Sequence, residues 1–197
     1  MIGYVKGLNY EMKFSIIFFI ILNISNVSFA NEYGSVTGLD IPRYVSIKSD
    51  DANMRVGPSK NYPIFIKYVR PNFPIKVIEE YQDWRKIIDY EEHSGWIHKS
   101  LLKGERHGLI ISIDQNNAKI YNTESGIQIG EIGNRAIIRL LKCKTNWCLI
   151  QKENHKGWIQ KKFIWGVKEN EEFNIGYFQT FYDLYFKSIN FLRVYLN

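Results

Sequence analysis

The chain has 197 residues, a net charge of +6 at pH 7 and an aromatic content of 15%. Two cysteines cannot supply the four ligands of a structural zinc site, and the four histidines form no metal-ligand spacing. No Cys-His or zinc-His constellation accompanies them, so we expect no catalytic residue, no metal and no cofactor.

The N-terminal segment has the pattern of a secretory signal peptide. A short positive region starts at Met12, the uncharged run FSIIFFIIL follows over residues 14–22, and the segment ends on Ser28-Phe29-Ala30. The small residues Ser28 and Ala30, at positions −3 and −1, predict cleavage after Ala30, so that residues 1–30 form the signal peptide and Met12 is its true start. The apolar run is shorter than the roughly 20 residues of a membrane span; an uncleaved anchor is the alternative.

Cleavage would leave a mildly basic mature chain. Residues 1–30 contain Lys6, Glu11 and Lys13, so their removal lowers the net charge from +6 to +5. An exported protein of this charge meets anionic cell wall or lipid headgroups rather than nucleic acid. We therefore expect a periplasmic or secreted protein that does not bind nucleic acid.

One phrase occurs twice in the chain, as HSGWIHKSLL at residues 93–102 and as HKGWIQKKFI at 155–164. Further positions match at nearly the same spacing, which predicts a tandem duplication. The matched groups are Gly95-Trp96-Ile97 with Gly157-Trp158-Ile159, Trp84 with Trp147, and Asn53-Met54-Arg55 with Asn117-Ala118-Lys119.

Each copy consists of short strand patterns separated by turns. No helical apolar period occurs between residues 40 and 165, and prolines break the region from Arg55 to Ile75 into a loop and an edge strand. We expect a mainly β protein with two tandem SH3-like small barrels, over residues 40–106 and 107–168. The longer expected strands are 45–49, 74–81, 84–90 and 95–99 in the first copy, and 109–113, 136–143, 147–153 and 157–161 in the second.

The repeated Gly-Trp pair is expected to close each barrel. Gly95 and Gly157 follow polar turns, where glycine permits a left-handed or bulged backbone before the last strand. Trp96 and Trp158 would then lie over the open end of the barrel, where such a ring buries about 150–250 Å². We assign these four residues and Trp147 a structural role.

The segments IPRYVSIKSDDANMRVGPSKNYPI (41–64) and WRKIIDYEEHSGWIHKSLLKGER (84–106) closely resemble the bacterial SH3-like domain family, in its exported two-copy form known from alphaproteobacteria. Residues 53–59 match the family motif NxRxGPS, in which Gly57 and Pro58 fix the loop. The second copy resembles the degenerate second repeat of that form, in Cys143, Trp147, Cys148 and Trp165-Gly166-Val167. It lacks the Gly-Pro pair, which leaves its ligand binding open. The resemblance covers residues 40–170 and implies a non-catalytic envelope module that binds cell wall or peptide.

The two cysteines flank the loop KTNW in an expected hairpin. Cys143 and Cys148 would then face each other across the hairpin, at a Cα separation of about 4.5–5.5 Å that a disulfide spans. An even cysteine count in an exported chain also favours a disulfide. A redox pair is the alternative, although reactive pairs more commonly have the spacing C-x-x-C.

The candidate ligand-binding residues lie in the first copy. They are Arg55, Tyr62, Tyr68 and Trp84. Tyr62 and Trp84 are expected to form a groove, because aromatic platforms bind extended peptides and sugars. Arg55 has a second interpretation, as the ion-pair partner of a nearby carboxylate such as Asp50, Asp51 or Asp83.

The tail, residues 169–197, differs in composition and lies outside the resemblance. Its spacing of aromatic and aliphatic residues predicts a helix, carried by Phe178, Phe181, Tyr185, Ile189 and Leu192. Such a helix would pack on the barrels, or contact a membrane surface or a partner. A tail altered by a frameshift is a further alternative.

These features predict an exported, non-catalytic binding module that recognises peptidoglycan or an extended peptide. Two alternatives stay open at this point. One is a structural envelope protein that scaffolds a protein partner, and the other is a regulatory module for a wall hydrolase.

Overall fold

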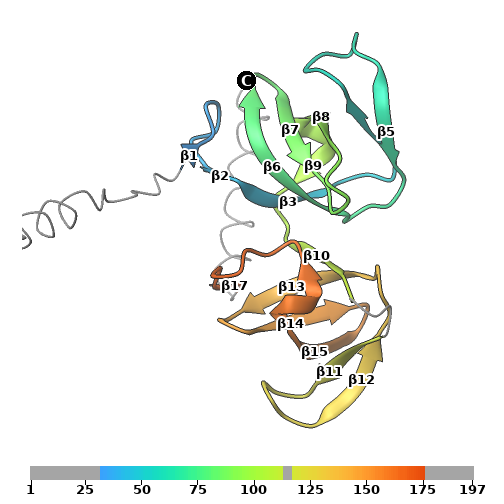
Figure 1. Ribbon diagram of the computed structural model, residues 1–197, viewed down its shortest axis with the longest axis vertical. Helices are drawn as coiled ribbons and strands as arrows, with labels where there is room; N and C mark the ends of the chain where they lie inside the picture. The colour runs from blue at the N-terminus through green and yellow to red at the C-terminus, as the bar shows by residue number, and fades with distance from the viewer. Residues whose placement is uncertain (1–31, 113–116, 176–197) are drawn as a thin grey trace, which may run out of the picture. The chain divides into compact units, whose positions relative to one another are not determined.

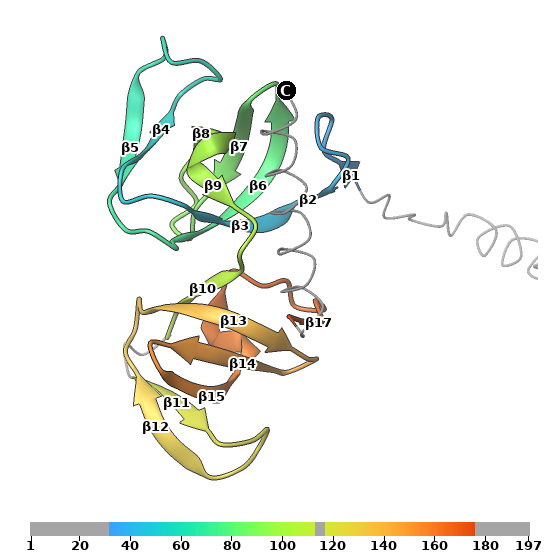
Figure 2. The same cartoon turned by 180° about the vertical axis from the view of Figure 1, so that it is seen from behind.

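The computed structural model describes residues 32–112 and 117–175, and it is built from short antiparallel strands (Figures 1 and 2). The expected signal peptide and residues 176–197 of the tail lie outside the described residues. Two short 3-10 turns, η1 (Lys99–Leu101) and η2 (Lys161–Phe163), interrupt the strands. Over the described ranges, no helix combines the length and the apolar character needed to cross a membrane.

The first barrel is a seven-stranded sheet with the order β5-β4-β8-β7-β6-β3-β9. A two-stranded hairpin, β1 (Glu32–Tyr33) with β2 (Asp40–Ile41), precedes it. The barrel strands are β3 (Arg43–Ile47), β4 (Ala52–Arg55), β5 (Ile64–Tyr68), β6 (Pro74–Tyr81), β7 (Trp84–Ile88), β8 (Ser94–His98) and β9 (Leu102–Lys103).

The second barrel repeats this topology with the order β12-β11-β15-β14-β13-β10-β16. A last strand, β17 (Phe173–Asn174), pairs with β13. The barrel strands are β10 (His107–Ile110), β11 (Ala118–Tyr121), β12 (Gln128–Ile132), β13 (Ile137–Cys143), β14 (Trp147–Lys152), β15 (His155–Gln160) and β16 (Ile164–Trp165).

Each barrel has its own apolar core. Alternation along the strands sends every second residue inward, so that Met54, Ile75 and Ile87 are fully buried in the first core. Ile138 and Ile150 take the places of Ile75 and Ile87 in the second. The expected mainly β fold with two SH3-like barrels is therefore confirmed.

The duplication extends to details of the sheet. The β6–β7 ladder shifts register between Val77 and Glu79, and the β13–β14 ladder shifts at the corresponding point, between Leu140 and Lys142. Extra residues of this kind bend a strand and increase its twist. Both barrels therefore curl at the same place.

The expected alignment of the first copy with the second is wrong by two residues at β4 and β11. Arg55 pairs with Trp96, and Tyr121 pairs with Trp158. The structural counterpart of Arg55 is therefore Tyr121, rather than Lys119. The polar Asn117 in the second copy imitates Asn53 in sequence but precedes the strand.

Gly95 and Gly157 are required for a reason other than the expected one. Neither is among the residues with positive φ; in the preceding turns Glu92 and Glu153 adopt that conformation, with φ of 61° and 53°. A Cβ atom on Gly95 would lie 2.8 Å from the carbonyl oxygen of Arg55. The glycine permits the close crossing of β4 over β8 that closes the barrel, and Gly157 faces β11 in the same way.

The two repeated tryptophans also lie elsewhere than expected. Ile97 is fully buried in the first core, so the alternation of β8 turns its neighbour Trp96 to the outer face, where it is partly buried. Trp158 is placed in the same way beside the buried Ile159. These rings cover the outside of the sheet and do not cap the core.

The N-terminal hairpin is fastened to the first barrel by one buried carboxylate. Glu80 accepts hydrogen bonds from Arg43 at 2.6 Å, from the Thr37 hydroxyl at 2.8 Å and from the amides of Val36 and Thr37. Burial alone would raise the pKa of Glu80, but these hydrogen bonds outweigh it and lower the pKa to about 2. Arg85 adds a contact at 3.3 Å.

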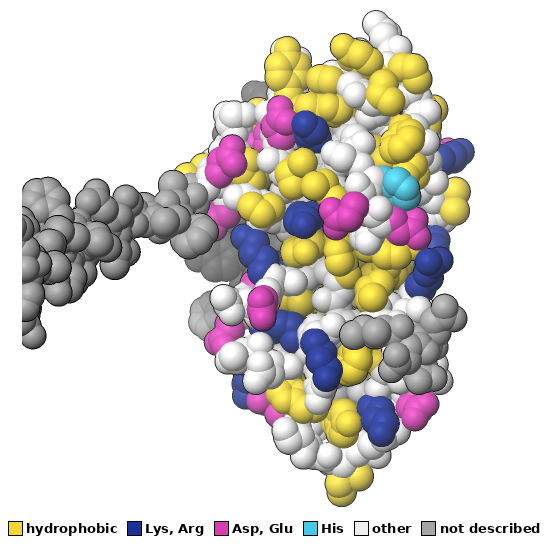
Figure 3. All heavy atoms as spheres, in the orientation of Figure 1, with side chains coloured by type: hydrophobic (Ala, Val, Ile, Leu, Met, Phe, Trp, Pro, Cys, Tyr) yellow, Lys and Arg dark blue, Asp and Glu magenta, His cyan; other side chains and the backbone are white. Residues whose placement is uncertain are grey.

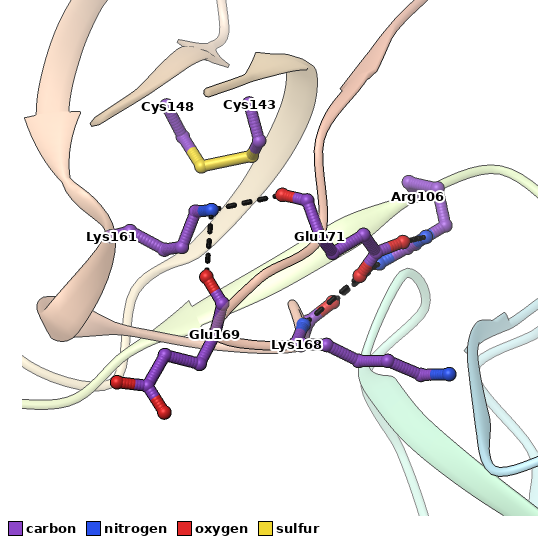
Figure 4. Close-up of a disulfide and its surroundings, with 8 residues drawn as sticks. Arg106, Cys143, Cys148, Lys161, Lys168, Glu169 and Glu171 are labelled. Atoms are coloured by element: carbon purple, nitrogen blue, oxygen red, sulfur yellow. Dashed lines mark hydrogen bonds and ion pairs between the residues drawn. A yellow bond between two sulfur atoms is a disulfide. The ribbon is translucent and has the colours of Figure 1, made fainter. Parts of the chain in front are cut away.

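The predicted disulfide between Cys143 and Cys148 is present, with a Cα separation of 4.1 Å. Both residues are buried in the second core. Figure 4 shows the disulfide beside Lys161, whose buried ammonium group donates to the carbonyl oxygens of Glu169 and Glu171. The start of the tail is thus held as a turn followed by β17, so the expected helix does not begin at residue 169.

Candidate binding surface

An outer platform crosses the first barrel on the face opposite its core. Directly paired residues of five adjacent strands form one row: Ile64, Arg55, Trp96, Lys86 and Glu79. A second row runs parallel to it through His98, Trp84 and Tyr81. Paired residues project to the same side of a sheet, and we call these eight residues the outer platform. Figure 3 shows hydrophobic side chains gathered on one face of this barrel, with basic and acidic ones among them.

Aromatic rings and cations alternate on the outer platform. The Tyr81 ring, half of which is exposed, meets Trp96 edge-on at 6.5 Å. The Lys86 ammonium lies 5.9 Å from the centre of the Trp96 ring and 3.2 Å from Glu79. An aromatic face beside a cation suits a ligand with both apolar faces and anionic or carbonyl groups.

Two candidate binding residues, Arg55 and Tyr62, lie in contact. The alternative interpretation of Arg55, an ion pair with a nearby carboxylate, does not hold among the described residues. The guanidinium of Arg55 donates to the carbonyl oxygen of Tyr62 at 2.6 Å. Asp51 pairs instead with Lys67, and Asp83 with Lys99. The Tyr62 ring lies against Gly57, where a Cβ atom would come within 2.7 Å of it. Gly57 therefore lets the ring close down on the loop.

Trp84 and Tyr68 are placed less favourably for a ligand. Both expose 8% of their surface. The Trp84 ring is met edge-on by His98 at 5.4 Å. Tyr68 points into the first core, where its hydroxyl donates to Asp89 at 3.1 Å, and burial followed by the nearby Asp89 carboxylate raises its pKa. The expected groove of Tyr62 with Trp84 stays a prediction, and on the outer platform Trp84 supports its exposed neighbour Tyr81.

The second barrel has a less charged counterpart of the platform. Its first row consists of Gln128, Tyr121, Trp158, Leu149 and Lys142. Lys86 is thus replaced by Leu149, but Lys144 approaches the Trp158 ring at 5.5 Å and restores a cation there. Trp147 meets Tyr121 edge-on at 5.3 Å. The aromatic part of the surface is therefore duplicated, while its charge pattern is not.

A hollow of about 600 Å³ lies beside Trp147 in the second barrel. Its wall includes Asn146, Gln160 and the buried Lys161. Lys161 already serves the turn that precedes β17 (Figure 4), which favours a structural role for this lysine. In the part of the chain that the structure describes, no group of three or more His, Cys, Asp or Glu side chains is placed to hold a metal ion.

Sequence comparison bears on both barrels. The family model described as "Bacterial SH3 domain" matches residues 48–104 and 124–166, which together make up half of the chain. The chain belongs to the bacterial SH3 domain family. The resemblance read from residues 41–64 and 84–106 is thereby confirmed. No curated protein matches the chain.

Among solved structures, similar chains include NlpC2 and NlpC1 from Trichomonas vaginalis and an NlpC/P60 family protein from Bacillus cereus ATCC 10987. Their identities to this bacterial SH3 chain are 11%, 10% and 13%, with TM-scores of 0.28, 0.27 and 0.28. The matches cover 63%, 62% and 62% of this chain and 48%, 45% and 55% of those chains. The chain thus spans about half the length of these proteins, and likeness at this level supports no statement about activity.

Proposed function

We propose that the protein is an exported, non-catalytic module that binds cell-wall material, with peptidoglycan as its ligand. Membership of the bacterial SH3 family supports this proposal, because such domains are binding modules. The signal-peptide pattern that ends at Ala30 supports export to the periplasm or beyond. Residues 40–106 and 107–168 would be the two modules.

The observation that carries the proposal is the outer platform of the first barrel. Neighbouring aromatic rings, here packed edge to face, provide contact area for sugars and extended peptides at little entropic cost. Glu79 balances Lys86, so that Arg55 leaves the platform with a net positive charge, which favours an anionic polymer over a neutral one. Tyr81 and Ile64 are each about half exposed, with exposed fractions of 50% and 51%, so they are accessible to such a ligand.

Co-sedimentation of the mature chain with purified peptidoglycan tests the proposal. We expect the protein in the pellet at low salt and less of it at high salt, because exposed charges are screened. Tyr81→Ala is expected to weaken binding, whereas Tyr33→Ala is not, since Tyr33 is at least as exposed but lies on β1. A protein that stays in the supernatant at low salt would contradict the proposal and favour a protein partner.

A further inference from the structure

The second barrel contains a cavity of about 400 Å³ that is apart from its aromatic row. Its apolar lining consists of Ile120, Ile150 and the exposed Ile129 together with Gly130 and Gly157, and its polar lining, here called the rim, consists of Glu131, Lys152, Asn154, His155 and Lys156. A largely apolar cavity of this size with a few polar groups at its mouth is the usual form of a small-ligand site.

The cavity and the charge at its mouth follow from three differences between the two copies. Strands β5 and β12 align so that Ile66 corresponds to Gly130 and Tyr68 to Ile132. In the first barrel Ile66 packs against the core, and the Tyr68 ring fills the interior below it. In the second barrel a Cβ atom placed on Gly130 would meet no heavy atom within 4 Å. The space of the Ile66 side chain is therefore open in the second copy, and the buried Ile132 fills only part of the space that the larger Tyr68 ring occupies in the first.

The third difference changes the charge at the mouth. In the first barrel Asp89 accepts the Tyr68 hydroxyl and the backbone amides of Glu91 and His93, so its carboxylate closes the turn. The pairing of β7 with β8 and of β14 with β15 places Lys152 at the position of Asp89. Lys156 stands next to it on the rim, and neither lysine has an ion-pair partner within residues 32–112 and 117–175. Two lysines beside one glutamate give the mouth a positive charge.

From these observations we propose that this cavity binds the carboxyl end of a peptide whose last residues are small and aliphatic. The aliphatic side chains would lie on Ile120, Ile129 and Ile150, and the terminal carboxylate would lie between Lys152 and Lys156. Strand β12 is at the edge of its sheet, so its outer backbone groups are placed to bond the peptide main chain as an added strand does. A free fatty acid would use the lysines but leave these backbone groups and Asn154 without partners.

Titration of the mature chain with soluble probes, followed by amide NMR, tests the assignment. The probes are N-acetyl-alanyl-alanine, the C-terminal amide of the same dipeptide, and hexanoate. We expect the dipeptide carboxylate to shift the Gly130 and Gly157 amides and to leave Gly95 unmoved. The amide should bind about tenfold more weakly, because it lacks the charge that the lysines recognise. Equal binding of the amide, equal or tighter binding of hexanoate, or no binding at millimolar concentrations would each overturn the proposal.

Two variants provide the matched controls. Gly130→Ile introduces the residue of the first copy into open space, so it is expected to fold normally and to abolish dipeptide binding. Lys152→Gln with Lys156→Gln should reduce the preference for carboxylate over amide, while Lys162→Gln, outside the cavity lining, should not. Tyr81→Ala changes the outer platform of the first barrel and must leave dipeptide binding to the second barrel unchanged. A failure of the peptidoglycan assay and a failure of this site can therefore be distinguished. Full binding by folded Gly130→Ile would contradict the assignment.

Discussion

The backbone of Arg55 passes so close to Gly95 that a Cβ atom there would lie 2.8 Å from the Arg55 carbonyl oxygen. We expect Gly95→Ala to lower the free energy of unfolding by about 2 kcal/mol, because a backbone that closes a barrel yields little to an added methyl group. Gly157→Ala should cost less. Its nearest backbone neighbour, the Tyr121 carbonyl oxygen, would be 3.2 Å away, and the closer Ile120 side chain is only partly buried, so it can move away by a change of its χ1 rotamer. Urea denaturation of both variants measures the difference.

Gly104→Ala is the control for the glycine series, since a Cβ atom on Gly104 meets nothing within 4 Å. It should be neutral or slightly stabilising, because alanine has less freedom than glycine in the unfolded chain. If Gly95→Ala were as stable as Gly104→Ala, the close crossing of β4 over β8 could not be the reason for the glycine.

The disulfide leads to a second prediction. Cys143 and Cys148 enclose a short loop, and a loop of this size is stabilised by about 2 kcal/mol when it is closed. The double variant Cys143→Ala with Cys148→Ala should therefore unfold at lower urea concentration than the oxidised protein. A reducing agent should lower the stability of the wild type and leave the double variant unchanged. Equal stability of the oxidised and reduced wild type would show that the bond does not stabilise the fold.

The buried Glu80 predicts a dependence of stability on pH. Its folded pKa of about 2 lies below the ordinary 4.5, so its contribution is complete above pH 4.5 and is lost as the pH falls from 4.5 towards 2. At pH 7 we expect Glu80→Gln to lower the unfolding free energy by about 3 kcal/mol, because the buried Arg85 and the partly buried Arg43 remain without a carboxylate. The difference between wild type and variant should narrow below pH 4.5, and thermal unfolding at several pH values measures it.

Glu79→Gln controls for the loss of a neighbouring charge. Glu79 pairs with Lys86 on the surface, where such pairs contribute about 1 kcal/mol or less. Glu79→Gln should therefore have a small effect throughout the pH range. A stability difference for Glu80→Gln that is the same at pH 7 and pH 2.5 would argue against an ionised Glu80 as the anchor of the N-terminal hairpin.

Much of the fold could be predicted because its signals are local. The β-branched runs, the polar turns and the repeated Gly-Trp-Ile phrase place the strands within a few residues, and β6 (Pro74–Tyr81) has the predicted bounds. The position of β11 could not be predicted in the same way. Asn117-Ala118-Lys119 imitates Asn53-Met54-Arg55 in sequence, but the register of a strand follows from which residues face the core. Ala118 is inward in the second copy, and it corresponds to Ala52.

The binding surface was less accessible from sequence because it depends on pairing across five strands. Tyr81 and Trp84 flank the two-residue turn Gln82-Asp83, so their proximity could have been inferred from the hairpin alone. The contact of Tyr81 with Trp96 requires the next strand as well. Gly130 can be read from the sequence, but the cavity that it opens can be inferred only when β12 is aligned with β5.

Lys161 is a buried lysine whose ammonium group donates to two carbonyl oxygens, of Glu169 at 3.0 Å and of Glu171 at 2.9 Å. It therefore fixes the turn that leads into β17 (Figure 4). We expect Lys161→Met to lower the free energy of unfolding by about 2 kcal/mol, because methionine keeps the length of the side chain but leaves both carbonyl groups without their donor. Urea denaturation gives the stability, and hydrogen exchange of the Ile175 amide, which bonds the Leu141 carbonyl oxygen, reports on β17 itself.

The neighbouring Lys162 supplies the control for Lys161, since its side chain is exposed and lies over the Phe163 ring at 5.0 Å. Lys162→Met removes the same charge and should change stability by about 0.5 kcal/mol or less, as surface substitutions usually do. The Ile175 amide should exchange faster in Lys161→Met than in Lys162→Met. The same exchange rate in both variants would mean that Arg106, which pairs with Glu171, holds the segment without help from Lys161.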